Sequence, residues 1–292
     1  MHNFKFTAPT DLKEAVGLKA LHKSTASFLA GGTDLLVFMR AGRKRPEWVI
    51  DVKKIPELNE MTVSKQGLTL GASVSCRDIY TNPHIARQYP AIADCTSLIG
   101  GIQVQGRATV GGNLCNAAPS ADIVPTLIAL NAIAHVASKR GRRQIPVAEF
   151  CTAPGRTVLE DDEILVSIGV PAPAANSGAR FLRFIPRNEM DIAEANAAAW
   201  VQLDEAQKTF ECVRIAIGAV APRPLYVAEA GAALEGMKIN EDSIRRAGQI
   251  ARAAASPIED MRGTVQHRLQ LVEVLTQRAL NGAIARARGE TV

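Results

Sequence analysis

The amino-acid sequence predicts an α+β protein, and two patterns along the chain lead to that class. Near the N-terminus, short strand-like runs alternate with helix-like runs, which favours a small and mostly parallel sheet. Near the C-terminus, three strand-like runs precede two amphipathic helical runs, which predicts a three-stranded sheet plus helices. Residues 171–178, rich in Pro and Ala, have the composition of a linker. The expected domains are residues 1–56, 57–176 and 179–288.

The first segment is expected to hold three strands and two helices. Thr10 suits the N-cap of the first helix. Ala15, Leu18 and Leu21 then fall on one apolar face of that helix. In chain order, the elements are a strand over 4–7, a helix over 11–21, a strand over 27–30, a helix over 34–41 and a strand over 48–51.

The second segment is expected to begin with a hairpin. Residues 61–64 and 68–70 flank Lys65-Gln66-Gly67, which is a turn signal. A glycine-rich loop is expected over 100–112. The remaining elements are helices over 76–81, 92–98 and 122–131, and strands over 132–138, 144–146 and 164–170.

The third segment follows the linker. The second and third of its three strands could pair through the turn at 204–208. Its strands are expected over 179–185, 193–203 and 211–220, and its amphipathic helices over 239–255 and 264–288.

Composition and charge exclude some classes of function. The chain has 292 residues, 47% hydrophobic and 22% charged, which is an ordinary globular balance. Its net charge of +5 includes two basic clusters, residues 40–45 and 139–143. Each cluster could bind an anion or an acidic partner, but a solvated turn is the favoured interpretation. Aromatic residues are not interleaved with these charges, so nucleic-acid binding is not expected.

The cysteines and the apolar runs point to an ordinary intracellular chain. The five cysteines form no CxxC pair and have no His at ligand spacing, so we expect no zinc site or iron–sulfur cluster here. The odd number of cysteines favours reduced, mostly buried thiols. We find no signal peptide pattern and no apolar run long enough for a membrane span. A cytoplasmic location is therefore expected.

The first stretch that carries chemistry is Leu29-Ala30-Gly31-Gly32-Thr33-Asp34-Leu35. A strand ends there, two glycines follow, and a helix begins. Glycines bring backbone N–H groups close to a ligand, and a helix N-terminus adds unpaired N–H groups, so the stretch suits phosphate. We expect the Asp34 carboxylate to point away and to cap its own helix. A plain tight turn explains this stretch equally well when it is taken alone.

The second such stretch runs from Gly100 to Asp122 and contains Thr109-Val110-Gly111-Gly112-Asn113. A second Gly-Gly turn with small polar neighbours again allows close backbone approach to a ligand, although a structural turn would look the same. Asp122 suits the N-cap of the following helix. Neither stretch matches the GxGxxG or GxxxxGK[ST] fingerprints, which disfavours a Rossmann enzyme and a P-loop NTPase.

Taken together, the two stretches resemble those of the FAD-binding (medium) subunits of the molybdenum hydroxylase family, which includes xanthine, carbon monoxide and nicotinate dehydrogenases. The resemblance spans nearly the whole chain in the same order. The blocks that carry it are Ala30–Leu35, Thr109–Asn113, Asp122, Glu163–Leu165 and Arg187–Ala193.

The resemblance implies that residues 1–176 form a two-subdomain FAD-binding domain of the PCMH (vanillyl-alcohol-oxidase-like) type, followed by the family's C-terminal flavoprotein domain. FAD would lie between the subdomains, with both glycine loops at its diphosphate. Ile164 and Leu165 match positions near the isoalloxazine, and Arg183 falls where relatives often carry a basic residue. A surface strand residue is the other interpretation of Arg183. The expected cofactor-binding residues are Leu29, Ala30, Gly31, Gly32, Thr33, Asp34, Leu35, Gly100, Ala108, Thr109, Gly111, Gly112, Asn113, Cys115, Asp122, Ile164, Leu165 and Arg183.

The resemblance also implies partners. Molybdopterin and the [2Fe-2S] clusters of the family lie on a large and a small partner subunit, while this chain would hold FAD non-covalently and pass electrons to NAD or another acceptor. Cys115 is the only candidate for covalent attachment, and we expect it to be a core thiol instead. Relatives specialised for carbon monoxide often read AGGHS where this chain reads AGGTD, which argues against carbon monoxide as the substrate.

Two other classes of function remain open from the sequence. A stand-alone flavin oxidase of the same fold would need acid–base groups at its own substrate pocket, and the five histidines are scattered outside the motifs. A binding-only protein with a degenerate flavin site is less favoured, because both glycine loops are intact.

Overall fold

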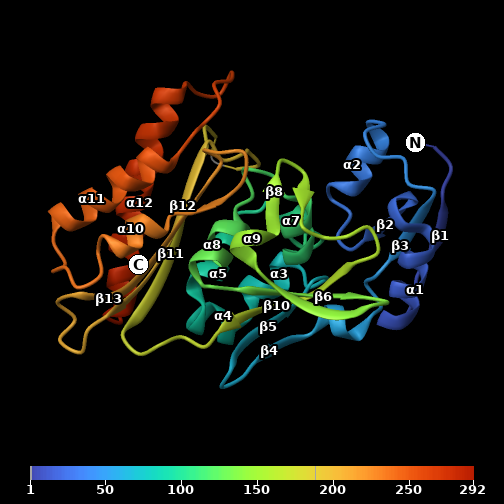
Figure 1. The fold of residues 1–292 in the computed structure, drawn as a ribbon, viewed down its shortest axis with the longest axis horizontal. Coiled ribbons are helices and arrows are strands. Elements are labelled where there is room, and N and C mark those ends of the chain that lie inside the picture. Colours follow the sequence, from blue (N-terminus) through green and yellow to red (C-terminus); the bar gives the residue numbers. More distant parts are fainter. Residues whose placement is uncertain (1, 188) are drawn as a thin grey trace.

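The computed structural model describes residues 2–187 and 189–292. Met1 and Asn188, the latter part of one motif block, lie outside the described residues. Figure 1 shows three parts along the longest axis of the molecule: a small N-terminal sheet with α1 and α2, a central sheet with short helices, and a C-terminal sheet covered by α10, α11 and α12. Both helices and strands are present in each part, which confirms the α+β class.

The N-terminal part is a parallel sheet, as the sequence predicts, and its strand order is β1-β3-β2. Two details of its first helix differ from expectation. Asp11 and not Thr10 is the N-cap, because the Asp11 side chain accepts a 2.8 Å bond from the Glu14 N–H. Leu21 is 72% exposed, so it does not belong to the apolar face. The elements are β1 (Lys5–Thr7), α1 (Leu12–His22), the 3-10 turn η1 (Lys23–Thr25), β2 (Ala26–Leu29), α2 (Leu35–Arg40) and β3 (Trp48–Asp51).

The central part is an antiparallel sheet with the order β4-β5-β10-β6-β7. The predicted hairpin of β4 and β5 is confirmed. The segment from 100 to 112 is not all loop, because it contains α6 and the first turn of α7. The strands are β4 (Met61–Val63), β5 (Gly67–Gly71), β6 (Ile133–Ser138), β7 (Gly141–Pro146) and β10 (Ile164–Pro171), with a small pair β8 (Cys151–Ala153) and β9 (Arg156–Thr157).

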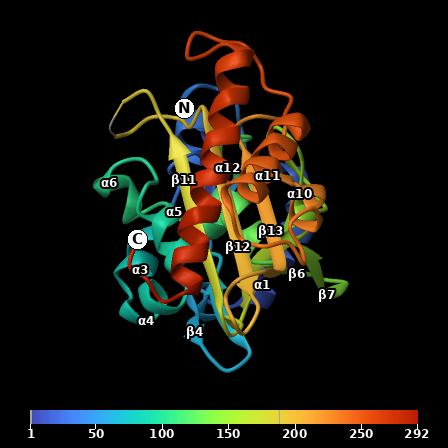
Figure 2. The ribbon, with the colours of Figure 1, turned by 90° about the vertical axis from the view of Figure 1, so that its left-hand side faces the viewer.

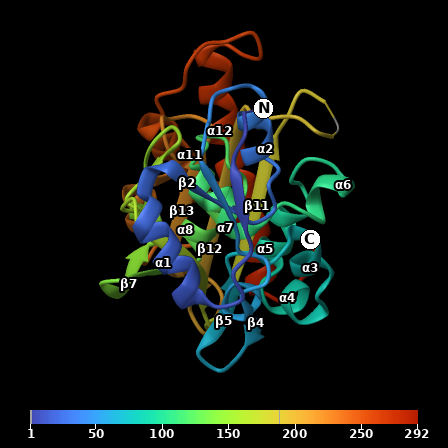
Figure 3. The ribbon, with the colours of Figure 1, turned by 90° about the vertical axis from the view of Figure 1, so that its right-hand side faces the viewer.

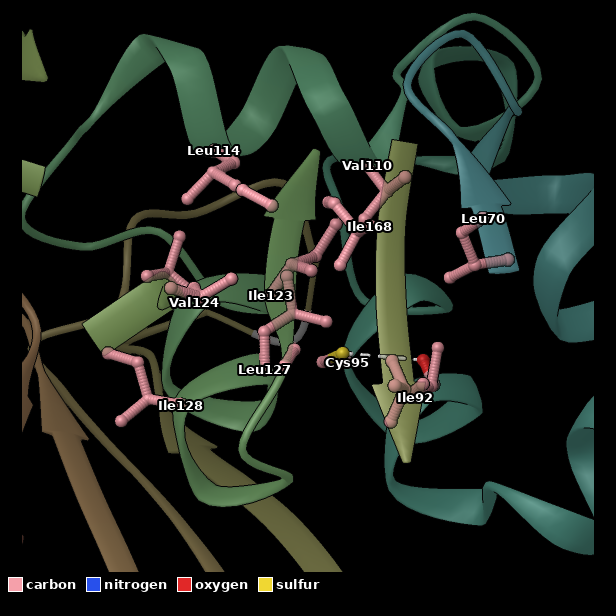
Figure 4. Packing of buried hydrophobic residues seen from close by; sticks show 14 of the residues in the cluster. Leu70, Ile92, Cys95, Val110, Leu114, Ile123, Val124, Leu127, Ile128 and Ile168 are labelled. Atoms are coloured by element: carbon pink, nitrogen blue, oxygen red, sulfur yellow. Dashed lines mark hydrogen bonds between the residues drawn. The ribbon is translucent and has the colours of Figure 1, made fainter. Parts of the chain in front are cut away.

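Short helices cover this sheet and bury its main apolar core. Figure 4 shows Leu70 of β5 and Ile168 of β10 facing Val110, Ile123 and Leu127 from the helices. The helices are α3 (Cys76–Thr81), α4 (Pro83–Gln88), α5 (Pro90–Thr96), α6 (Ile102–Gln105), α7 (Val110–Asn116), α8 (Ile123–Ala129) and α9 (Val147–Phe150), with the 3-10 turn η2 (Pro56–Asn59).

The C-terminal part is a sheet with the order β11-β12-β13-β14. It has the three expected strands and a fourth of two residues, β14, which the sequence did not predict. Ser177 and Gly178, assigned to the linker, begin β11. Figure 2 shows α12 lying along the outer face of β11 and β12. The elements are β11 (Ser177–Phe184), β12 (Ala195–Leu203), β13 (Phe210–Gly218), β14 (Leu225–Tyr226), α10 (Ala228–Ala232), α11 (Glu241–Ala254) and α12 (Val265–Ala287).

Charged side chains join the C-terminal part to the central helices. Asp94 of α5 accepts from Arg286 of α12 at 2.7 and 2.9 Å, and from Arg180 of β11 at 3.1 Å. These atoms are only partly exposed, so the pairs are less screened than surface ion pairs. Among the described residues, we find no helix long and apolar enough to cross a membrane.

Candidate functional site

A cleft with a volume of about 430 Å³ lies between the N-terminal and central parts. One wall is formed by β2, the loop after it and α2. The other is formed by the start of α7 and by residues around 157–165. Figure 3, which looks from the N-terminal end, shows α1 and α2 nearest to the viewer with α7 behind them. Both glycine stretches of the sequence face this cleft.

The first glycine pair holds the loop in a conformation that few other residues adopt. Gly31 lies against the second glycine stretch, since a Cβ on Gly31 would come within 1.9 Å of the Arg107 carbonyl oxygen. Gly32 has φ of +77°, in the left-handed region that favours glycine. The Gly32 carbonyl accepts from the Leu36 N–H at 3.1 Å, so the loop leads directly into α2.

The second glycine pair is helical and not a turn, contrary to expectation. Thr109 is the N-cap of α7, and its hydroxyl accepts from the Gly112 N–H at 3.0 Å. A Cβ on Gly111 would lie 2.5 Å from the Ala72 carbonyl oxygen, so this glycine packs on the segment after β5. Gly112 faces the cleft, where a Cβ would meet only the Thr109 hydroxyl, at 2.9 Å.

Asn113 and Cys115 of α7 complete this wall. The Asn113 Oδ1 atom is buried and has no hydrogen-bond partner among the described residues. A buried polar atom without a partner is costly, so its position at the cleft fits a ligand that supplies one. Cys115 is exposed to the cleft, so the expectation of a core thiol is wrong. The surrounding cleft walls desolvate its thiol and raise its pKa to about 12.

Asp34 also lines the cleft, and its carboxylate does not cap its own helix as we expected. Its side chain makes no capping hydrogen bond to α2. Shielding from water by the cleft walls raises the pKa of Asp34, and the nearby Lys44 opposes this rise.

Asp122 and Arg183 form a buried ion pair outside the cleft lining. Asp122 also accepts from the Asn196 amide at 3.2 Å, and its carboxylate makes no cap to α8, contrary to expectation. Burial raises the pKa of Asp122, while Arg183 lowers it. Arg183 is therefore neither a surface residue nor a cation without a partner. The resemblance placed Ile164, Leu165 and Arg183 near the isoalloxazine. Ile164 and Leu165 line the cleft but Arg183 does not, so the three residues do not form one site.

The structure thus brings most of the predicted site together. Four predicted residues are not in the cleft lining: Leu29, Gly100, Asp122 and Arg183. Leu29 packs against the glycine loop, because its Cδ1 lies 2.8 Å from the position that a Cβ on Gly32 would take. The residues that sequence reasoning missed include Lys19, Ser27, Phe28, Phe38, Lys44, Asn116, Thr157, Leu159, Glu160 and Asp161. Lys44 carried one signal, its place in a basic cluster, and that cluster was interpreted as a solvated turn.

Paired glycine loops that face one cleft between two subdomains are typical of a protein that binds a phosphate-containing cofactor. Residues 2–173 match the family model "FAD binding domain in molybdopterin dehydrogenase". Residues 180–283 match "CO dehydrogenase flavoprotein C-terminal domain". The two matches follow each other in the order that the sequence motifs predict.

Individual relatives agree with these matches over their whole length. The xanthine dehydrogenase FAD-binding subunit of Escherichia coli O157:H7 is 32% identical, over 96% of this chain and 95% of the relative. The carbon monoxide dehydrogenase medium chain of Hydrogenophaga pseudoflava is 32% identical, over 97% and 98%. The solved structure of carbon monoxide dehydrogenase from Hydrogenophaga pseudoflava superimposes with a TM-score of 0.94, covering 98% of both chains. Quinoline 2-oxidoreductase from Pseudomonas putida 86 gives a TM-score of 0.90 at 29% identity, again covering 98% of both chains.

The chain belongs to the family of FAD-binding medium subunits of molybdenum-containing dehydrogenases. The resemblance drawn from the motifs is confirmed, as are FAD as the cofactor and the class of oxidoreductase flavin subunit. The cleft fits this cofactor, since the glycines of both stretches line it and Asn113 offers an unpartnered acceptor.

Proposed function

We propose that this chain is the electron-relay subunit of a cytoplasmic molybdenum hydroxylase. It takes electrons from the [2Fe-2S] clusters of a small partner subunit and passes them to NAD or another acceptor, while a large molybdopterin subunit oxidises the substrate. The observation that carries this proposal is the full-length likeness to a medium chain, which covers 97% of this chain and 98% of that relative. Bound FAD supplies the redox chemistry.

The residues of the chain would position the cofactor. The backbone at Gly32 and Gly112 would lie against the diphosphate, and Asn113 would accept a hydrogen bond. Asp122 and Arg183 would fix the neighbouring edge of the C-terminal sheet, because they pair across the junction of the two parts. The domains proposed from the sequence, residues 1–56, 57–176 and 179–288, place the cleft between the first two.

The cofactor should be held non-covalently. Cys115 faces the cleft, but with a pKa of about 12 its thiol stays protonated at neutral pH, and a thiol is a poor nucleophile. Acid precipitation of the purified protein should therefore release all of its flavin into the supernatant. Flavin retained on the denatured chain would contradict this prediction. If Cys115→Ser then released that flavin, Cys115 would be the attachment point.

A stand-alone oxidase would need acid–base groups beside its substrate. None of the described histidines lines the cleft: His22 stacks on Trp48, and His267 lies beside Glu194 and Phe184. His135 is in β6, where burial lowers its pKa. These positions favour the relay over the oxidase.

The test of the relay is flavin reduction by purines, N-heterocycles and aldehydes, with and without the partner subunits. We expect the flavin of the isolated chain to stay oxidised with each substrate and to be reduced when both partners are present. If NAD is the acceptor, NADH should reduce artificial dyes through the isolated chain. Substrate-driven reduction in the isolated chain would overturn the relay in favour of the oxidase.

A further inference from the structure

Lys44 stands at the cleft although it belongs to the basic cluster of residues 40–45. The chain folds back after α2, since the backbone N–H groups of Arg43 and Lys44 donate to the Phe38 carbonyl at 2.9 and 3.2 Å. This turn places the Lys44 ammonium 5.9 Å from the centre of the Phe38 ring. Lys44 and Phe38 both line the cleft, so the cluster is not merely a solvated turn.

The other cation of the cleft, Lys19, already makes hydrogen bonds within the protein. Its ammonium donates to the Lys23 carbonyl at 2.7 Å and to the Ala26 carbonyl at 2.8 Å. Burial lowers the pKa of Lys19. By contrast, the Lys44 ammonium makes no hydrogen bond or ion pair within the described part of the chain, and it lies over the Phe38 ring instead. Lys44 is therefore the cleft cation that can serve a ligand.

The charge of Lys44 reaches both walls of the cleft. Desolvation raises the pKa of Asp34 on the first wall and of Cys115 on the second, and Lys44 opposes both rises. The remaining charged residues of the cleft are acidic, namely Glu160, Asp161 and Glu163. Glu163 is neutralised by Arg143, which contacts it at 2.7 Å, but Glu160 and Asp161 have no such ion pair among the described residues. A cofactor with a doubly negative diphosphate entering this cleft needs a compensating cation.

We propose that Lys44 binds the FAD diphosphate across the mouth of the cleft. The inference rests on FAD binding in this cleft, not on the route of the electrons. An ammonium on a flexible stem is a good phosphate ligand because it acts as a point charge. The N–H groups of Gly111 and Gly112 already donate to the Ala72 carbonyl and the Thr109 hydroxyl, so the phosphates would rely on the backbone of the first glycine loop. Lys44 adds the positive charge that backbone groups lack.

The test uses apo full-length protein and titration with FAD or riboflavin, followed by flavin fluorescence. Riboflavin has the same ring but no phosphate. Lys44→Ala should raise the Kd for FAD about tenfold or more, the size expected for a charge-assisted contact, and leave the Kd for riboflavin unchanged. Lys44→Arg should keep FAD affinity within about threefold because it keeps the charge. The effect of Lys44→Ala should shrink as salt is added.

Lys139→Ala is the matched control, because Lys139 is an exposed lysine in the other basic cluster and outside the cleft. It should bind FAD like the wild type. Unchanged FAD affinity in Lys44→Ala would overturn the proposal. An equal loss for FAD and riboflavin would also overturn it, since it would show that Lys44 acts by shaping the cleft around Phe38. Because no partner is present, the result does not depend on whether the relay exists.

Discussion

The two glycine pairs of the cleft are alike in the sequence but differ in backbone conformation. In each pair the first glycine packs one part of the chain against another: Gly31 against Arg107, and Gly111 against Ala72. The second glycine of each pair makes no such backbone contact and lines the cleft, as the first does. However, Gly32 has a positive φ, whereas Gly112 lies in the first turn of a helix. We therefore expect the first glycine of each pair to matter mainly for packing and the second mainly for cofactor binding. Three substitutions test that difference.

The largest effect is expected for Gly31→Ala. The new Cβ would come within 1.9 Å of a backbone oxygen, so the two glycine loops would have to separate. Overpacking of this kind lowers the free energy of unfolding by about 3 kcal/mol. We expect a loss of roughly that size in the free energy of unfolding, measured in urea. The control is Gly17→Ala in α1, where nothing lies within 4 Å, and it should stabilise the protein by about 0.5 kcal/mol. A Gly31→Ala protein as stable as the wild type would show that the contact is dispensable.

A smaller loss of stability, joined to loss of cofactor, is expected for Gly32→Val. The left-handed conformation costs a non-glycine residue about 1–2 kcal/mol. The new Cβ would also clash with Leu29, whose Cδ1 lies 2.8 Å from that position, so we expect the loop backbone to shift into the phosphate position. The purified variant should contain no FAD. Gly42→Val carries similar strain, with φ of +72°, at a position outside the cleft. If Gly42→Val also lost its flavin, backbone strain and not occlusion of the cleft would be the cause.

The smallest effect on stability is expected for Gly112→Val. Its backbone is helical, so we expect the free energy of unfolding to change by less than about 1 kcal/mol. The side chain would nonetheless enter the cleft, and FAD binding should be abolished. Gly17→Val, in a helix away from the cleft, is the matched control and should keep its flavin. Wild-type flavin content in Gly112→Val would show that the second glycine stretch does not contribute to the phosphate site.

The sequence predicted the main strands and long helices well, because apolar periodicity is a local property. It did not predict the helix α7, since glycine disfavours helices and only tertiary contacts reveal the outcome. The tertiary contact is the packing of Gly111 on Ala72, and the local Thr109 cap adds to it. The same limit applies to the cap of α1, where Thr10 and Asp11 are both good capping residues.

The candidate site was predictable where its residues stand in motifs. The far wall at Thr157–Asp161 was missed because long-range pairing of β10 with β6 brings it to the cleft. The role of Arg183 depended on finding its partner Asp122, which is 61 residues away in the chain. The motifs predicted which residues belong to the site. The spacing of those residues in the sequence could not predict which charges pair or which side chains are buried.

The contact between Asp94 and Arg286 has a consequence for biosynthesis. The two residues are 192 positions apart, so Arg286 is synthesised long after Asp94. Domains generally fold in order as they leave the ribosome, so the FAD-binding part emerges while the Asp94 carboxylate still lacks its strongest partner. A nascent or prematurely terminated chain would therefore expose an uncompensated charge at the face of α5 that later receives β11 and α12. Completion of α12 marks the point at which that face is covered.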